Sequence, residues 1–167
     1  VTGSHWNQMV LEESGCDNSI LIHQGVDLSK FNSIQIPRLI NRPLVIFSGG
    51  KLEARKGQDI VVDAFKRFLR ICPDALLIAC WANVGNIGIN TMIKTPYVSN
   101  NPKSGKAADI HNWLLEQGIP AANVVVPTAV TNSQLPNLIK QSDVAVFTSR
   151  CEGGTNLMAM ETLACGV

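Results

Sequence analysis

The chain has 167 residues, 46% of them hydrophobic and 16% charged, a balance typical of one globular domain. The net charge of +1 excludes a broad basic surface of the kind that binds nucleic acid or an acidic membrane. No apolar run approaches the roughly 20 residues of a membrane-spanning helix, and the five cysteines show neither a CxxC pair nor the spacing of metal ligands, so we expect buried, reduced thiols.

The predicted elements begin with an amphipathic stretch at residues 1–15 and a short strand at residues 19–22. Prolines within and just after residues 27–42 indicate a linker. Residues 81–102 are long, polar and rich in glycine and asparagine, which predicts a loop or an insertion.

Apolar strands and amphipathic helices alternate along the rest of the chain. Short apolar runs predict strands at residues 44–47, 75–80, 124–126 and 144–147. Apolar residues at helical spacing predict helices at residues 59–71, 104–117, 133–141 and 156–164. Strands that are apolar on both faces favour a parallel α/β sheet with helices on both faces.

A cationic loop, residues 49–57, follows the first strand of the predicted sheet. It reads Gly-Gly-Lys-Leu-Glu-Ala-Arg-Lys-Gly, so glycines and three cations precede a helix. Cations at this position face the positive end of the helix dipole, a penalty of roughly 0.3–1 kcal/mol each, which a bound diphosphate would reverse. Taken alone, the loop is better explained as a solvated turn with Glu53 and Asp59 as counter-charges. It matches neither a P-loop nor a dinucleotide fingerprint.

An acidic segment, residues 152–161, follows the last predicted strand and reads Glu-Gly-Gly-Thr-Asn-Leu-Met-Ala-Met-Glu. With Thr155 as the N-cap of the following helix, the first helical N–H groups lack partners, and the glycines allow close approach of an anion. The residues with these free N–H groups would be Asn156, Leu157 and Met158. The two glutamates could accept hydrogen bonds from sugar hydroxyls. An ordinary strand–turn–helix junction with solvated glutamates explains the segment equally well.

The two loops are expected at one edge of the sheet, because parallel α/β sheets bind ligands at the carboxyl ends of their strands. Two loops that could each bind an anion are much less expected by chance at one edge of a sheet than a single such loop.

Three segments of the chain resemble, in the right order, the donor-binding half of a family 4 retaining glycosyltransferase with the GT-B fold. The family's Gly-Arg-Leu…Lys-Gly loop is matched by Gly50-Lys51-Leu52 and by Lys56-Gly57. Lys51 stands where the family usually has arginine, a change that keeps the charge but loses bidentate phosphate binding.

The acidic segment and both of its flanks share the resemblance. Residues 135–138 and 142–149 resemble the helix and strand that precede the family's acidic motif, and residues 161–166 fit the second half of that motif. The family has seven residues between the two glutamates, whereas eight separate Glu152 from Glu161 here. The glycine loop, which contains Gly153 and Gly154, is therefore one residue longer. Residues 4–6 and 23–27 resemble the last helix and strand before the interdomain linker.

The resemblance implies a Rossmann-like parallel sheet that forms one half of a GT-B fold. Residues 1–37 would be the end of the acceptor domain and the interdomain linker, and residues 38–167 the nucleotide-sugar donor-binding domain, truncated at its C-terminus. The implied partners are a nucleotide-diphosphate sugar and an acceptor hydroxyl, with no nucleic acid. The implied reaction retains the anomeric configuration. No Asp-x-Asp occurs in the sequence, which agrees with a metal-independent enzyme without a cofactor. We expect a cytoplasmic protein, with peripheral membrane association only through the missing domain.

The resemblance also assigns roles to single residues. Lys51 and Lys56 would hold the charge of the leaving diphosphate, and Glu152 would face the hydroxyls of the donor sugar. Glu161 would accept hydrogen bonds from the ribose, and Val130 would meet the nucleobase through its backbone. The residues assigned to donor binding are Gly50, Val130, Gly153, Gly154, Thr155, Asn156, Leu157 and Glu161.

The remaining charged and imidazole side chains are expected outside the chemistry. Arg55 and Arg150 would be surface or neighbouring charges, and His5, His23 and His111 would have structural or solvated roles.

Three alternatives to a transferase remain open. A sugar-nucleotide epimerase can share the GT-B architecture, and so can a phosphorylase, although nothing in the sequence indicates the pyridoxal lysine that a phosphorylase needs. The third alternative is a non-catalytic module that binds a nucleotide sugar.

Overall fold

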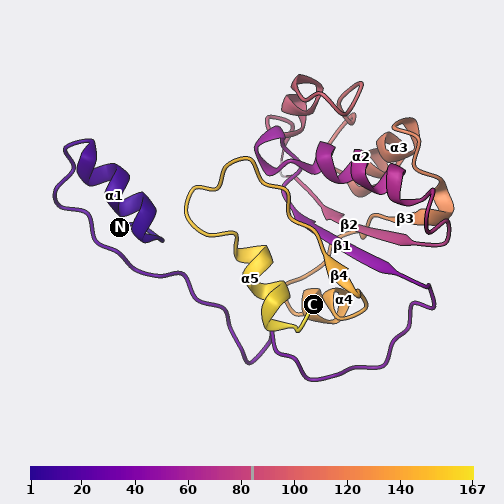
Figure 1. Cartoon of the computed structure of the whole chain (residues 1–167), viewed down its shortest axis with the longest axis horizontal. Coiled ribbons are helices and arrows are strands. Elements are labelled where there is room, and N and C mark those ends of the chain that lie inside the picture. Colours follow the sequence, from indigo (N-terminus) through magenta and orange to yellow (C-terminus); the bar gives the residue numbers. More distant parts are fainter. Residues whose placement is uncertain (84) are drawn as a thin grey trace.

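The computed structural model describes residues 1–83 and 85–167. Within them, parallel strands form a four-stranded sheet in the order β3-β2-β1-β4 (Figure 1). The strands are β1 (Val45–Gly50), β2 (Leu76–Trp81), β3 (Val124–Val125) and β4 (Val144–Ala145). β1 and β2 pair from Val45 opposite Leu76 to Gly50 opposite Trp81, so the two long apolar strands form the centre of the sheet.

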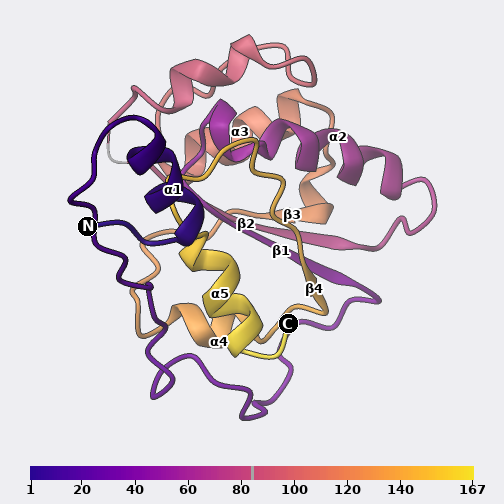
Figure 2. The ribbon, with the colours of Figure 1, turned by 60° about the vertical axis from the view of Figure 1, so that its left-hand side comes forward.

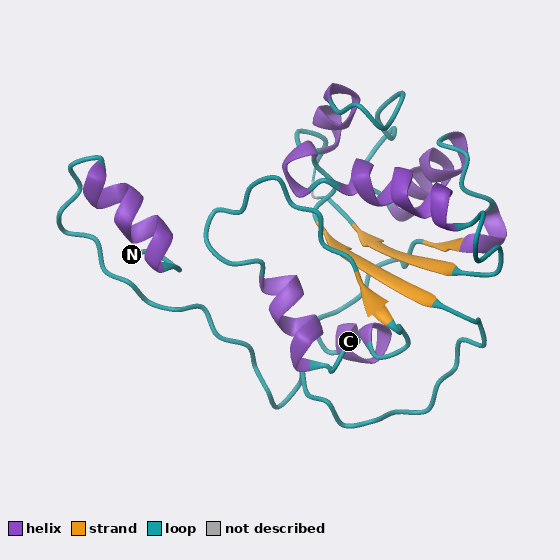
Figure 3. Cartoon of the chain, viewed as in Figure 1, coloured by secondary structure: helices purple, strands orange, loops and turns teal. Residues whose placement is uncertain are grey.

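Helices cover both faces of this sheet (Figure 3), which confirms the predicted fold class. The α-helices are α1 (His5–Glu13), α2 (Gln58–Phe68), α3 (Ala107–Glu116), α4 (Leu135–Ile139) and α5 (Leu157–Ala164). The short 3-10 helices are η1 (Ala54–Lys56), η2 (Ile89–Lys94) and η3 (Ala121–Asn123). Among the described residues, no helix has the length and apolar character needed to cross a membrane.

Each face of the sheet has its own hydrophobic core. Leu77 of β2 packs in one core with Phe65 of α2 and Trp113 of α3. The next residue, Ile78, belongs to the opposite core, together with Ile139 of α4. Because successive side chains of a strand point to opposite faces, a strand covered on both sides must be apolar throughout. This is why β2 appears in the sequence as a continuous apolar run.

Residues 81–102 contain more structure than the predicted loop. The 3-10 helix η2 lies within them, and its residues Ile89 and Met92 are completely buried in the core beside α2 and α3. Two apolar residues at a spacing of three are too few to reveal a helix by periodicity in a stretch that is otherwise polar.

The N-terminal segment differs from its prediction in one respect. Residues 19–22 do not form a strand, because Leu21 makes only an isolated bridge to Thr2. The amphipathic stretch does form α1, although none of its residues is buried and Trp6 is 61% exposed. The irregular chain that follows is attached to the main body by Phe31, which is buried in the core on the side of α4.

The cysteines only partly follow the sequence-based expectation. All five are free, but Cys165 alone is buried, and Cys151 is exposed in the loop before Glu152. The expectation of buried thiols is therefore wrong for Cys151, because composition and spacing carry no information about the depth of a single loop residue.

Candidate functional site

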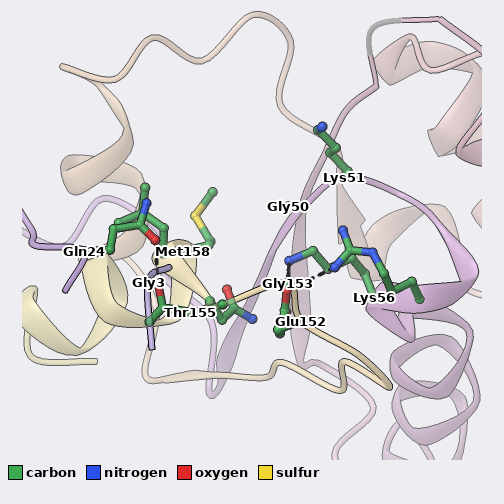
Figure 4. A pocket seen from close by; sticks show the side chains of 13 residues that line it. Gly3, Gln24, Gly50, Lys51, Lys56, Glu152, Gly153, Thr155 and Met158 are labelled. Atoms are coloured by element: carbon green, nitrogen blue, oxygen red, sulfur yellow. Dashed lines mark hydrogen bonds and ion pairs between the residues drawn. The ribbon is translucent and has the colours of Figure 1, made fainter. Parts of the chain in front are cut away.

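The cationic loop and the acidic segment line one hollow at the carboxyl ends of β1 and β4 (Figure 4). The hollow has a volume of about 490 Å³. It is lined by residues 50–51, 55–56 and 152–158, together with Gly3 and Gln24 of the N-terminal segment. The shared edge expected from the carboxyl ends of parallel strands is therefore observed.

Thr148 and Arg150 lie in the chain that follows β4. Their side chains attach this part of the chain to the cationic loop and to α2. The guanidinium of Arg150 makes two hydrogen bonds to the completely buried carboxylate of Asp59, with N–O distances of 2.6 and 2.7 Å. The Thr148 hydroxyl donates to the carbonyl of Gly57 at 2.6 Å. Arg150 does not line the hollow, so it acts as a structural link between the two loops.

Gly57 allows the two loops to approach closely. Its φ angle is +72°, in the left-handed region that favours glycine, and a Cβ atom there would lie 2.1 Å from the carbonyl oxygen of Thr148. Any larger residue would force the cationic loop away from the chain that leads into the acidic segment.

Glu152 is held by the cations of the cationic loop. Its carboxylate lies 2.6 Å from the ammonium of Lys56 and 3.2 Å from a guanidinium nitrogen of Arg55, and it accepts a hydrogen bond from Ser149. Burial raises the pKa of this carboxyl, but the hydrogen bonds from Lys56 and Ser149 and the charges of Lys56 and Arg55 outweigh burial, so the pKa lies below its ordinary value. In this structure the ammonium of Lys56 is therefore already paired with a carboxylate of the protein itself.

Lys51 differs from Lys56 in being exposed, and its ammonium makes no ion pair within the described residues. It follows Gly50, whose φ angle of +118° turns the chain out of β1. Arg55 lines the hollow but is engaged by Glu53 at 2.5 Å as well as by Glu152. Lys51 is thus the more available of the two lysines for a ligand.

The N-terminus of α5 is capped by Asn156, and the prediction of Thr155 as the N-cap is wrong. The Asn156 side chain accepts a hydrogen bond from the backbone N–H of Ala159 at 3.2 Å. The Thr155 hydroxyl instead donates a hydrogen bond to the side-chain oxygen of Gln24. As the first two residues of α5, Leu157 and Met158 have N–H groups without an acceptor in the described part of the chain, and both residues line the hollow.

Two of the residues assigned to donor binding lie outside this lining. Glu161 is in α5 and is only 9% exposed, and burial raises the pKa of its carboxyl. Val130 is half-buried and packs against the core on the side of α4 and α5. The structure therefore brings together Gly50, Lys51, Lys56 and residues 152–157, but neither Glu161 nor Val130 contacts the hollow.

The N-terminal segment supplies contacts that the sequence did not indicate. The side-chain amide of Asn7 in α1 donates to the carbonyl of Gly153, and Gln24 pairs with Thr155 (Figure 2 shows α1 close to the start of α5). His5 belongs to α1, as Asn7 does, and His23 precedes Gln24 in the sequence; the two imidazole rings are in a T-shaped arrangement with their centres 5.3 Å apart. No local pattern relates Asn7 to a glycine 146 residues away, so only the three-dimensional structure reveals this contact.

Within residues 1–83 and 85–167, no three histidine, cysteine, aspartate or glutamate side chains are grouped as ligands for a metal ion. The acidic groups at the site are instead paired with lysine and arginine.

The fold is that of a Rossmann-like α/β domain of the type found as the C-terminal half of GT-B glycosyltransferases. The family model described as "Glycosyl transferases group 1" matches residues 29–167, and the chain belongs to this family. A search of curated proteins found no match.

A solved structure agrees with this assignment. The chain is similar to the C-terminal domain of a glycosyl transferase group 1 family protein from Francisella tularensis, with a TM-score of 0.60 and 17% sequence identity. The match covers 84% of this chain and 66% of that chain, so this chain spans just under two thirds of the solved structure. At this identity, the likeness shows a shared fold.

Proposed function

We propose that this chain is the donor-binding part of a retaining glycosyltransferase of family 4. In this proposal, residues 1–37 are the end of the acceptor domain and the linker, and residues 38–167 bind a nucleotide-diphosphate sugar. The observation that carries the proposal is that Lys51, Lys56 and the first two residues of α5, whose N–H groups lack acceptors among the described residues, all line one hollow. Membership of the glycosyl transferase group 1 family supports the same substrate class.

The proposed chemistry is hexosyl transfer to an acceptor hydroxyl. Negative charge develops on the diphosphate as it leaves, and prepositioned cations and N–H dipoles stabilise that charge. Lys51 and Lys56 would supply the cations, and Leu157 and Met158 would supply the N–H groups. No metal ion is required in this scheme.

Glu152 would have a second role once the donor is bound. A diphosphate that takes the ammonium of Lys56 releases the Glu152 carboxylate, which would then face the hydroxyls of the donor sugar. The neighbouring glycines, Gly153 and Gly154, would allow this movement, because glycine imposes little restriction on the backbone.

We further propose that Glu161 accepts hydrogen bonds from the ribose and that Val130 meets the nucleobase. Both residues lie on the face of the sheet that α4 and α5 cover. The enzyme would be cytoplasmic, with its acceptor bound by another domain.

Calorimetric titration with UDP, GDP and ADP tests the proposal. We expect the wild-type chain to bind one of them, and we expect Lys56→Ala to weaken that binding roughly 10-fold or more, the equivalent of about 1.4 kcal/mol. Lys106→Ala is a matched control, because Lys106 is exposed and outside the hollow. Wild-type protein that binds none of the three nucleotides, or equal affinity in Lys56→Ala, would contradict the proposal.

A further inference from the structure

The turn that carries Lys51 is held by side chains from the segment between β2 and α3. The side-chain oxygen of Asn83 accepts a hydrogen bond from the N–H of Leu52 at 2.7 Å, and its side-chain nitrogen donates to the carbonyl of Leu52 at 2.9 Å. The Thr91 hydroxyl accepts a hydrogen bond from the N–H of Ala54 at 2.8 Å. One amide side chain therefore satisfies both backbone groups of the residue that follows Lys51.

A third side chain completes this network from α2. Gln58 donates to the carbonyl of Lys51 at 2.5 Å and accepts a hydrogen bond from the N–H of Glu53 at 3.3 Å. Gln58 is only 2% exposed, and the Leu52 side chain is completely buried. Three side chains thus make hydrogen bonds to five backbone N–H and C=O groups of residues 51–54. Surface loops are usually less constrained.

Asn83 and Thr91 are themselves held in place around Gly88. A Cβ atom on Gly88 would lie 2.5 Å from the side-chain nitrogen of Asn83, so only glycine leaves room for that amide. The Thr91 hydroxyl donates to the carbonyl of Gly88 at 2.6 Å. Asn83, Gly88 and Thr91 therefore support the cationic loop from behind.

The side chain that this support can direct is Lys51. Its ammonium is exposed and makes no ion pair within the described residues, and the side chain lies between the hollow of the candidate site and a second hollow of about 450 Å³. Because the ammonium has no ion-pair partner among the described residues, the Cα–Cβ direction set by the backbone biases which of the two hollows the charge can reach. Ordering a free lysine side chain costs conformational entropy, so a fixed starting direction favours binding.

We propose that Asn83 and Thr91 are positioning residues that direct Lys51 toward the diphosphate of the donor, an inference that rests on the proposed function. Asn83 and Thr91 are then part of the binding machinery, although neither side chain lines the main hollow. The two side chains would fix the geometry of the cationic loop and would affect the ligand only through the position of Lys51.

The test is calorimetric titration of the same chain with UDP, GDP and ADP, using the nucleotide that the wild-type protein binds. We expect Thr91→Val, which loses one hydrogen bond to the cationic loop, to weaken binding roughly 2- to 12-fold, and Asn83→Ala, which loses two, to weaken it at least as much. Thr91→Ser keeps the hydroxyl and should restore wild-type affinity. Asn86→Ala is the matched control, because Asn86 is an exposed asparagine of the same segment and is not among the residues whose side chains hydrogen-bond to the cationic loop.

A double-mutant cycle separates positioning from general structural support. If Asn83 acts through Lys51, then Asn83→Ala should have no further effect on affinity in a Lys51→Ala background. An equal loss in both backgrounds would overturn the inference, as would wild-type affinity in both Asn83→Ala and Thr91→Val. Should Asn83→Ala fail to fold, the comparison of Thr91→Val with Thr91→Ser in the two backgrounds decides the question. A wild-type chain that binds none of the nucleotides would refute the proposed function itself.

Discussion

The two glutamates of the acidic segment have opposite electrostatic environments. Glu152 is surrounded by Lys56, Arg55 and Ser149, and its pKa is lowered. Glu161 has no ion pair within the described residues, and burial raises its pKa. Ionised Glu161 therefore costs stability in the absence of a ligand, which is typical of groups kept for function rather than for folding.

This difference gives a prediction for Glu161→Gln. Because the folded-state pKa of Glu161 lies above its ordinary value of 4.5, the folded protein binds the proton more tightly than the unfolded chain does. Stability should fall as the pH rises from about 4.5 through the folded-state pKa, and the full cost should be present at neutral pH. We expect Glu161→Gln to be more stable than wild type in urea unfolding at pH 7, with the advantage disappearing near pH 4, while binding nucleoside diphosphate less tightly.

Glu13→Gln is the control for this experiment, since Glu13 is exposed in α1 and lies outside the hollow. A Glu161→Gln protein that is less stable than wild type at pH 7 would show that the carboxylate is stabilised by the fold.

Among the elements of the chain, the junction between the cationic loop and α2 is the most constrained. We predict that Gly57→Ala destabilises the protein by at least about 1–3 kcal/mol, because it combines backbone strain with a clash against Thr148. Urea unfolding measures the loss. Gly15→Ala is the matched control: Gly15 also has a positive φ angle, +85°, but a Cβ atom there has nothing within 4 Å. Equal losses in the two variants would mean that the contact with Thr148 carries no strain.

The elements themselves were largely predictable, and the errors have physical causes. The alternation of apolar strands with amphipathic helices predicted the parallel sheet and its two covered faces, because burial on both sides requires a continuous apolar strand. The 3-10 helix η2 was missed because its two buried residues, Ile89 and Met92, make no recognisable period. The N-cap of α5 was placed one residue early, since Thr155 and Asn156 are both good capping residues and the contact of Thr155 with Gln24 decides between them.

The candidate site was predictable to a similar extent. The cationic loop and the acidic segment were found because each follows a parallel strand, and the carboxyl ends of parallel strands lie at the same edge of the sheet. The supporting contacts of Asn83, Thr91 and Asn7 were not found, because each depends on the packing of segments far apart in the sequence.

For the molecule as a whole, the contact between the N-terminal segment and the glycine loop joins the two ends of the chain. We predict that Asn7→Ala speeds hydrogen exchange at the amides of residues 153–155, because the variant loses the hydrogen bond from α1 to Gly153. Mass spectrometry of the exchanged protein measures this effect. Gln8→Ala is the control. Gln8 lies in the same helix, but its side-chain amide donates a hydrogen bond to the carbonyl of Ser19, within the N-terminal segment. Unchanged exchange in Asn7→Ala would show that the glycine loop is held without α1.

The pairing of Glu152 with Lys56 has a consequence for the kind of anion that can enter. Because a carboxylate of the protein already neutralises the ammonium, entry of a phosphate is an ion exchange rather than the filling of an uncompensated positive field. Chloride and other monovalent ions bring no more charge than the carboxylate they would displace, so they gain little from the exchange. A diphosphate brings more charge and can also reach Lys51. If the proposed donor binds here, the resident carboxylate would thus favour ligands that carry two or more negative charges over monovalent ions at Lys56.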